Sequence, residues 1–195
     1  MPKKKILVIM GHPDSESLNA AIAKEYISTA EKFGADIKFI DLRKLKFDPI
    51  LHYGYRKKQR LEPDLKKAQE DILWADHLVF IYPTWGGGFP ALLKGFIDRT
   101  LLPGFAFKFH KGSELLPEQL LKRKSGRIIT TTGGPSWLYR IIPHPGILSA
   151  KLFTLYFCGI SPTRVTLFGK IRKISKERAK KIFEKVRRVA RIDVG

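Results

Sequence analysis

Short apolar runs alternate along this chain with longer stretches in which apolar residues recur at helical spacing. Five runs have the length and composition of strands, at 5–10, 35–41, 78–82, 127–132 and 163–168, and those at 5–10 and 78–82 are apolar enough to be buried on both faces. The intervening spacing predicts helices over 18–33, 64–74, 90–100, 146–157 and 175–191. Strands that alternate with helices indicate βαβ units, and hence an α/β fold built on a parallel sheet.

Five strands and about five helices match a doubly wound sheet in the order 2-1-3-4-5, with helices on both faces. The length of 195 residues predicts a single domain over 1–195. In this order the loops after the first, third and fourth strands converge at the carboxyl edge of the sheet. Open α/β sheets bind their ligands at that edge, so these three loops are the candidate site.

Other parts of the chain carry weaker signals. The first helix should face the core with Leu18, Ile22, Tyr26, Ala30 and Phe33. Residues 42–63 form a long basic and aromatic connection without periodicity. Residues 110–126 form a polar connection, with a helical turn expected around 117–121.

The loop after the first strand suits a phosphate group. Ser15, Ser17 and Asn19 offer hydroxyl and amide groups beside the free N–H groups at the start of a helix. Plain capping of that helix by Ser17 explains the same residues equally well. The chain has neither G-x-G-x-x-G after this strand nor a P-loop, so a phosphate would be bound here without a glycine fingerprint.

The loop after the third strand carries a tryptophan among glycines. Pro83 ends the apolar run, Trp85 follows, and Gly86 opens a run of three glycines. With Tyr82 and Phe89 nearby, the loop suggests a flat ring as ligand, and a tight turn with one surface tryptophan is the alternative.

Composition narrows the function classes. The formal net charge of +19 implies attraction to phosphate-bearing cofactors, nucleic acid or a membrane surface, with a solvated basic surface as the alternative. The single cysteine, Cys158, leaves no disulfide framework and fits a reducing cytoplasm. The histidines are scattered, so no metal site is expected, and no span approaches membrane length. The basic last helix lacks a known reader motif, so nucleic acid is not expected as a partner.

In their order along the chain, the motifs resemble those of the flavodoxin-like NAD(P)H:quinone oxidoreductases, in particular the shorter bacterial members. The resemblance covers nearly the whole chain. It is carried by G-H-P-x-S-x-S-L-N at 11–19, F-D-P-I-L at 47–51, Y-P-T-W-G-G-G-F-P-A-L-L-K-G-F-I-D-R at 82–99, G-F-A-F-K-F at 104–109, T-T-G-G at 131–134 and F-C-G-I at 157–160.

The resemblance implies a role for each matching position. The flavin phosphate and ribityl chain would be held by His12, Ser17, Leu18 and Asn19. The isoalloxazine ring would be lined by Pro83, Thr84, Trp85 and Gly86 on one edge, and by Thr131, Thr132, Gly133 and Gly134 near its pyrimidine side. Tyr139 and His144 would be catalytic and stabilise the negative charge of the reduced flavin near N1 and O2; for His144, between two prolines, a structural role is the alternative. Phe107 and Phe109 match aromatic residues that reach the partner's site, which implies a homodimer.

The implied reaction is ping-pong hydride transfer from NAD(P)H through the flavin to a quinone or a similar flat acceptor. The C-terminal extension that helps to build an FAD adenine pocket in longer members is absent, which favours FMN over FAD. Azo or nitro reduction and an accessory role, for example in a potassium-efflux system, are alternatives. An electron-carrier flavodoxin is a further alternative, although such carriers are usually acidic. The sequence does not decide the physiological acceptor, or between NADH and NADPH.

Overall fold

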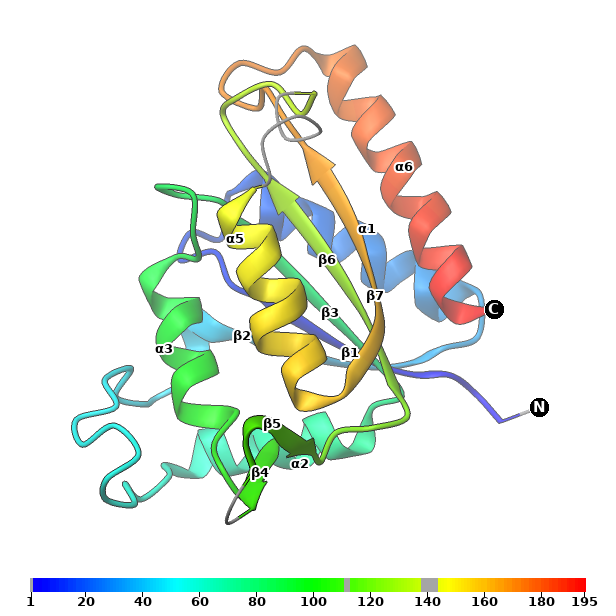
Figure 1. Cartoon of the computed structure of the whole chain (residues 1–195). Coiled ribbons are helices and arrows are strands. Elements are labelled where there is room, and N and C mark those ends of the chain that lie inside the picture. The colour runs from blue at the N-terminus through cyan, green and yellow to red at the C-terminus, as the bar shows by residue number, and fades with distance from the viewer. Residues whose placement is uncertain (1, 111–112, 138–143) are drawn as a thin grey trace.

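Five parallel strands form the centre of the molecule in the computed structural model, which describes residues 2–110, 113–137 and 144–195 (Figure 1). The strands are β1 (Lys5–Met10), β2 (Asp36–Asp41), β3 (His77–Pro83), β6 (Lys124–Thr131) and β7 (Ile160–Phe168). They lie in the order β2-β1-β3-β6-β7, and each neighbouring pair is parallel. Strands β4 and β5 form a separate hairpin, so β6 and β7 are the fourth and fifth strands of this sheet. The order is therefore the 2-1-3-4-5 expected from the sequence.

Helices cover both faces of the sheet. One face is covered by α1 (Leu18–Lys32) and α6 (Lys176–Val194), which pack against each other. The other face is covered by α2 (Pro63–Trp74), α3 (Ala91–Thr100) and a continuous helix made of α5 (Pro145–Leu148) and the π-helix η2 (Ser149–Tyr156). In Figure 1, α5 lies in front of the strands and α1 lies behind them.

The two-residue period of each strand decides which of two cores a side chain enters. On β1, Leu7 and Ile9 pack in the core with α2 and α3, whereas Ile6, Val8 and Met10 pack in the core with α1 and α6. All five side chains are at most 1% exposed. A strand buried on both faces has a continuous apolar sequence, which is why these runs could be assigned to a parallel sheet.

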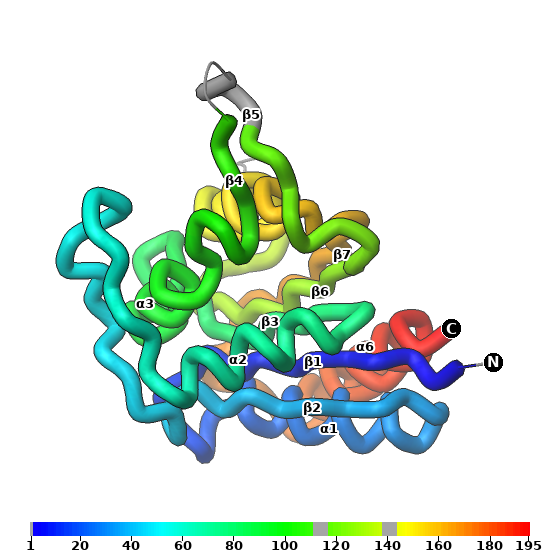
Figure 2. Tube along the Cα trace, turned by 90° about the horizontal axis from the view of Figure 1, so that it is seen from below, coloured from blue at the N-terminus to red at the C-terminus, as the bar shows by residue number. Residues whose placement is uncertain are grey.

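Residues 107–119 contain an antiparallel hairpin that lies outside the parallel sheet. Its strands are β4 (Phe107–His110) and β5 (Ser113–Gln119), and Figure 2 shows them projecting from the molecule. The helical turn expected around 117–121 is therefore wrong. The backbone N–H of Leu120 donates to the carbonyl of Ala106 and that of Leu121 to the carbonyl of Cys158. These partners are distant in sequence, so the local pattern could not indicate the extended structure.

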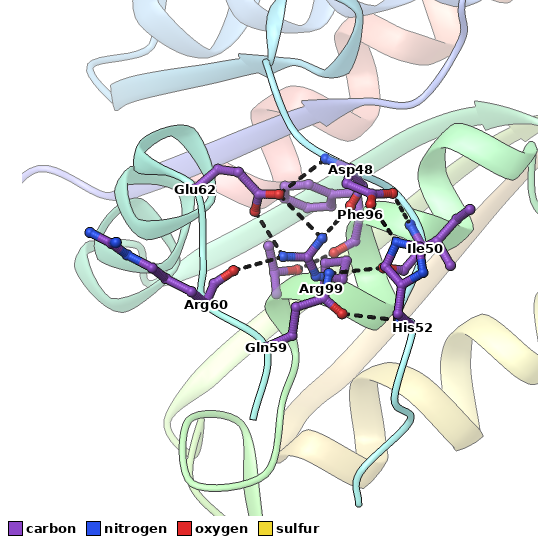
Figure 3. Close-up of polar contacts among 9 residues, drawn as sticks. Asp48, Ile50, His52, Gln59, Arg60, Glu62, Phe96 and Arg99 are labelled. Atoms are coloured by element: carbon purple, nitrogen blue, oxygen red, sulfur yellow. Dashed lines mark hydrogen bonds and ion pairs between the residues drawn. The ribbon is translucent and has the colours of Figure 1, made fainter. Parts of the chain in front are cut away.

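The long connection before α2 has only the short 3₁₀ helix η1 (Leu42–Lys44), and no helix or strand over 45–62. Arg99 of α3 organises it. This fully buried guanidinium donates to the carbonyl oxygens of Asp48 and Arg60 and pairs with the carboxylate of Glu62 at 2.8 Å (Figure 3). One turn earlier on α3, Gly95 leaves room for the connection: a Cβ there would lie 2.4 Å from a side-chain atom of Pro49.

Phe33 departs from the expected inward face of the first helix, because it is 46% exposed. It is the C-cap of α1 rather than a residue of the helix, and the Arg191 guanidinium lies over its ring at 4.8 Å. The stripe of apolar residues therefore ends one turn earlier than the sequence pattern suggested.

Candidate functional site

Backbone hydrogen bonds tie the residues that follow β1 and β3 to the ends of the neighbouring strands β3 and β6, at the carboxyl edge of the sheet. The N–H of Gly11 donates to the carbonyl of Ile81 at 2.8 Å. The N–H of Thr84 donates to the carbonyl of Thr131, also at 2.8 Å, and the hydroxyls of Thr84 and Thr130 lie 2.9 Å apart. The three loops expected to converge therefore do so, and rigid backbone contacts fix their relative positions.

The first loop is braced by its own side chains. Ser17 caps α1: its Oγ accepts the N–H of Ala20 at 3.2 Å and donates to the carbonyl of Asp14 at 2.8 Å. The N–H of Asp14 in turn donates to Nδ1 of His12 at 2.9 Å. Burial lowers the pKa of His12 below its ordinary value, so at neutral pH the ring is uncharged and carries its proton on Nε2. The first N–H groups of α1 have no intrahelical acceptor and face this loop.

Asn19, at the start of α1, connects the first loop to the end of β6. Its side chain is almost fully buried, and its Nδ2 donates to the hydroxyl of Thr131 at 2.9 Å. Its Oδ1 has no hydrogen-bond partner among the described residues. A buried acceptor of this kind costs free energy unless a donor reaches it, so the position favours a ligand with hydroxyl or N–H groups. Leu18, beside it, packs partly buried against the core.

The second loop is a tight turn that holds Trp85 half exposed. The N–H of Gly88 donates to the carbonyl of Trp85 at 2.9 Å, and the N–H of Trp85 donates to the carbonyl of Gly88 at 3.3 Å. Gly86 and Gly87 have φ angles of +55° and +78°, a conformation that favours glycine at both positions. The indole packs edge-to-face on the ring of His12, with 5.4 Å between ring centroids. The flat-ring and tight-turn interpretations are thus compatible, because the turn is what presents the tryptophan.

Helix α5 supports this turn from behind. A Cβ on Gly146 would lie 2.5 Å from the carbonyl oxygen of Gly87 and 3.1 Å from the Cα of Gly88. The backbone of the helix therefore touches the backbone of the turn. Gly146 was not among the residues expected at the candidate site, because nothing local in the sequence links it to a turn about 60 positions earlier.

The third loop is bonded to the turn after β7, which the sequence analysis did not include in the site. The N–H of Thr132 donates to the carbonyl of Phe168 at 2.9 Å, and the N–H of Lys170 donates to the carbonyl of Gly134 at 2.7 Å. The side chain of Arg172 lies against Gly133, where a Cβ would be 2.9 Å from its Nε. A permanent positive charge therefore lies at the edge of the glycine loop.

Of the two residues expected to be catalytic, the structure describes only His144. Tyr139 lies outside the described residues. His144 is the N-cap of α5, and its Nδ1 accepts the N–H of Ile147 at 3.3 Å. Burial lowers its pKa, so at neutral pH this ring is uncharged. His144 thus has a structural role as a helix cap in addition to any contact with a ligand.

The two phenylalanines expected near a partner differ in exposure. Phe107 is 5% exposed and packs edge-to-face on Phe157 with 4.9 Å between centroids, whereas Phe109 is 47% exposed. A cavity of about 310 Å³ lies beside them, between α3, β4 and η2. Its walls include the aromatic rings of Tyr55 and Phe153.

A doubly wound parallel sheet whose carboxyl-edge loops form a ligand site defines a class of α/β protein. Comparison with family models gives a match to the flavodoxin-like fold family over residues 4–192. The chain therefore belongs to this family.

Among curated proteins, an uncharacterized NAD(P)H oxidoreductase of Haemophilus influenzae is 33% identical, over 91% of this chain and 90% of its own length. A ribosyldihydronicotinamide dehydrogenase (quinone) of Mus musculus is 28% identical, over 82% of this chain and 78% of its own length. Among solved structures, Smu.1420 from Streptococcus mutans superposes with a TM-score of 0.83 at 34% identity, over 96% of this chain and 99% of that one. An FMN-dependent NADH-azoreductase from Bacillus anthracis, in complex with FMN, shares the fold at 19% identity and a TM-score of 0.75, over 98% of this chain and all of that one.

Proposed function

We propose that this protein is a flavin-dependent NAD(P)H:quinone oxidoreductase, which reduces quinones or similar flat acceptors by two electrons. The observation that carries the proposal is the bond from the N–H of Thr84 to the carbonyl of Thr131 at the end of β6, which places the half-exposed indole of Trp85 beside two glycines at the ligand-binding edge. A relative named as an NAD(P)H oxidoreductase matches nearly the whole chain, and one named as a quinone dehydrogenase matches most of it.

The described residues fit FMN as the cofactor, with FAD as the alternative. The N–H groups at the start of α1 suit its phosphate. The buried Oδ1 of Asn19 suits a ribityl hydroxyl, because it is an acceptor that has no donor among the described residues. The turn at Trp85 offers a flat apolar surface and glycine backbone that a ring can approach closely. The azoreductase that shares the fold is named as FMN-dependent, which supports the same choice.

The residues that would hold the cofactor fall into three groups, one from each loop. We propose that the phosphate and ribityl chain contact His12, Ser17, Leu18 and Asn19. The ring would contact Pro83, Thr84, Trp85 and Gly86 on one edge, and Thr131, Thr132, Gly133 and Gly134 on the other. Because Pro83 and Thr131 are themselves buried, they would shape the floor of the site through their backbone rather than through exposed side chains.

When bound, FMN would supply the hydride acceptor that links NAD(P)H oxidation to reduction of the second substrate. The chain would hold the ring through backbone amides and keep one face open beside Trp85. Negative charge near the pyrimidine edge would be balanced by the N–H groups of Gly133 and Gly134 and by the guanidinium of Arg172. The neutral rings of His12 and His144 would act as hydrogen-bonding groups rather than as cations. Tyr139 stays a proposed catalytic residue at the same edge.

Steady-state kinetics of the FMN-loaded protein test this proposal. With NADPH varied at several fixed concentrations of a water-soluble quinone, a ping-pong reaction gives parallel double-reciprocal lines. Converging lines would contradict a ping-pong reaction, in which the reductant and the acceptor bind one after the other at the same site. Turnover that does not depend on added FMN would contradict the flavin mechanism itself.

We also propose that the protein is a homodimer located in the cytoplasm. Exposed aromatic side chains line the cavity beside Phe109, with Tyr55 67% and Phe153 70% exposed. Large apolar side chains gathered in this way are typical of surfaces that another chain covers. None of the described helices is long and apolar enough to cross a membrane.

A further inference from the structure

Positive charge is concentrated in one segment of the chain. Residues 170–191 contain eleven lysines and arginines but only two acidic residues, Glu177 and Glu184, so this short segment carries about half of the net charge of +19. The segment consists of the turn that follows β7 and most of α6. We call its outer surface the α6 basic face.

Most of the basic side chains of this face are exposed to solvent. Helix α6 buries Ile182, Val186, Val189 and Ala190 against α1 and the sheet, and its basic residues occupy the opposite side. All eleven of the lysines and arginines are exposed except Arg187, which is partly buried. Figure 1 shows α6 along the outside of the molecule, with its first turn at the end where β6 and β7 finish.

Most of these charges are not neutralised within the protein. Lys181 pairs with Glu177 at 2.8 Å and Arg187 with Glu25 at 2.6 Å. The other exposed basic side chains of the face form no ion pair with a carboxylate of the described residues. They are Lys170, Arg172, Lys173, Lys176, Arg178, Lys180, Lys185, Arg188 and Arg191. A polyanionic partner would therefore complement the face without first breaking internal pairs.

The face also carries features that suit a lipid surface better than a nucleic acid. Between Lys176 and Val194 the helix contains no Ser, Thr, Asn or Gln, the uncharged side chains that usually join Lys and Arg in contacts with phosphate and bases. Two large apolar side chains are exposed near these charges: Ile192 of α6 at 50%, and Trp137 at 57% on the loop whose Gly134 is bonded to the turn. Mixed basic and aromatic surfaces are typical of proteins that lie on a membrane.

We propose that the α6 basic face docks on the surface of a membrane that contains anionic lipids. Because the apolar side of α6 is occupied by the core, the helix lies on the headgroups rather than inserting, and the attraction is mainly electrostatic. The basic turn is bonded to Gly134, so docking places the edge of the candidate site close to the bilayer. This last point rests on the proposed function, since quinones that are apolar concentrate in lipid.

Sedimentation with vesicles tests the proposal on the full chain without flavin or substrate. The wild type should sediment with vesicles of phosphatidylcholine mixed with phosphatidylglycerol, should stay in solution with phosphatidylcholine alone, and should be released by high salt. Reversal of three charges on the face, in Lys180→Glu/Lys185→Glu/Arg188→Glu, should weaken binding by more than about tenfold. The neutral variant, with Gln at the same three positions, should weaken it less.

A matched control distinguishes an effect of this face on vesicle binding from an effect of net charge alone. Lys58, Lys66 and Lys122 are exposed, lie outside α6 and form no ion pair among the described residues. Their reversal to Glu makes the same change in net charge and should leave vesicle binding within about twofold of the wild type. Equal losses in the charge-reversed face variant and in the control variant, or no binding of the wild type to anionic vesicles, would overturn the proposal. So would tight, salt-sensitive binding to a DNA duplex by a protein that anionic vesicles do not retain.

The result of the vesicle-binding experiment does not depend on the proposed reaction. All three triple variants should bind FMN and reduce a water-soluble quinone as the wild type does, because none of their changed residues belongs to the candidate site. Loss of vesicle binding with unchanged turnover would support the docking surface. Vesicle binding by a protein that takes up no flavin would leave the docking surface in place and remove the proposed function.

Discussion

Gly146 is the residue whose lack of a side chain matters most to the candidate site. Its Cα faces the backbone of the Trp85 turn so closely that a methyl group would lie 2.5 Å from the carbonyl oxygen of Gly87. Neither partner can move alone, because the turn is closed by its own hydrogen bonds and Gly146 is in the first turn of α5. The position of the tryptophan is therefore set by a contact between two backbones.

Gly146→Ala should displace the Trp85 turn and weaken FMN binding by about tenfold or more, equivalent to about 1.4 kcal/mol. Fluorescence titration of the apoprotein with FMN measures the dissociation constant. Pro145→Ala changes the exposed neighbouring residue of the same helix and serves as the control. Equal affinities of the two variants would show that the turn tolerates the methyl group.

Asp193 is buried at the other end of the sheet, where it joins α6 to the strands. Its carboxylate accepts the hydroxyl of Tyr26 at 2.8 Å and Nη2 of Arg127 at 2.6 Å, and Nε2 of His77 lies 3.4 Å away. Burial alone would raise the pKa of this carboxyl. The hydrogen bonds and charges of His77 and Arg127 outweigh burial and lower the pKa to about 2.

The ionised form of Asp193 should therefore stabilise the fold in a pH-dependent way. The carboxyl has a pKa near 3.9 in an unfolded chain, so the contribution of about 2–3 kcal/mol is fully present above about pH 5 and is lost as the pH falls towards 2. Urea unfolding of the wild type and Asp193→Asn should show a gap in free energy that is constant above pH 5 and narrows below pH 4.

Asp36→Asn is the control for that series, because among the described residues the carboxylate of Asp36 forms only an exposed pair with Lys3 at 3.7 Å. Its unfolding free energy should stay close to that of the wild type across the pH range. A gap for Asp193→Asn that keeps its size down to pH 3 would contradict the assignment of this carboxylate.

At the scale of elements, the connection over 45–62 depends on one side chain from another element. Arg99 is fully buried and supplies hydrogen bonds to two backbone carbonyls of the connection, where a strand or helix would use its own backbone (Figure 3). Its partner Glu62 is partly exposed, so water can still reach the carboxylate.

Arg99→Met should lower the free energy of unfolding by about 3 kcal/mol, because removing one partner of a buried pair leaves the other groups unsatisfied. Limited proteolysis should also cut the connection faster. Arg60→Met is the control, since the network uses only the backbone carbonyl of Arg60. If the two variants unfold at the same urea concentration, the buried guanidinium does not hold the connection.

The sequence predicted those elements whose signal is local. β1 and β3 are continuous apolar runs, and α6 has a regular apolar face, so their type could be inferred from periodicity. The strand order then brought the loops at Ser17, Trp85 and Gly133 together, as observed. The hairpin of β4 and β5 was missed, because its backbone bonds to Ala106 and Cys158 depend on chain segments that pack only in the folded molecule.

The missed parts of the site have the same cause. Gly146 touches the Trp85 turn and Arg172 touches Gly133 across long stretches of sequence. No motif marks either residue, because a glycine in the first turn of a helix and an arginine in a basic turn are common for other reasons. Burial also bears on the role that the resemblance implied for His144: its lowered pKa means that the ring would stabilise negative charge as a neutral hydrogen-bonding group.

At the scale of the whole molecule, two exposed surfaces have different chemistry. The aromatic surface around the 310 Å³ cavity, with Phe153 70% exposed, suits a second copy of the chain. The α6 basic face suits an anionic partner. Because the two surfaces belong to different elements, a dimer formed through the first would leave the second available.

Phe153→Asp should convert the proposed dimer to a monomer, since it places a charge in the centre of the aromatic surface. Sedimentation equilibrium at micromolar concentration measures the mass directly. Phe33→Asp, at a residue that is 46% exposed at the end of α1, is the control and should remain dimeric. A monomeric wild type, or the same mass for both variants, would contradict the assignment of this surface.

Anaerobic titration of the FMN-reconstituted protein tests the central claim most directly. The account predicts that the protein binds FMN, that one equivalent of NADPH or NADH bleaches the yellow absorbance, and that one equivalent of quinone restores it. A protein that binds no flavin, or whose bound flavin keeps its absorbance in the presence of both reductants, would contradict the proposed function.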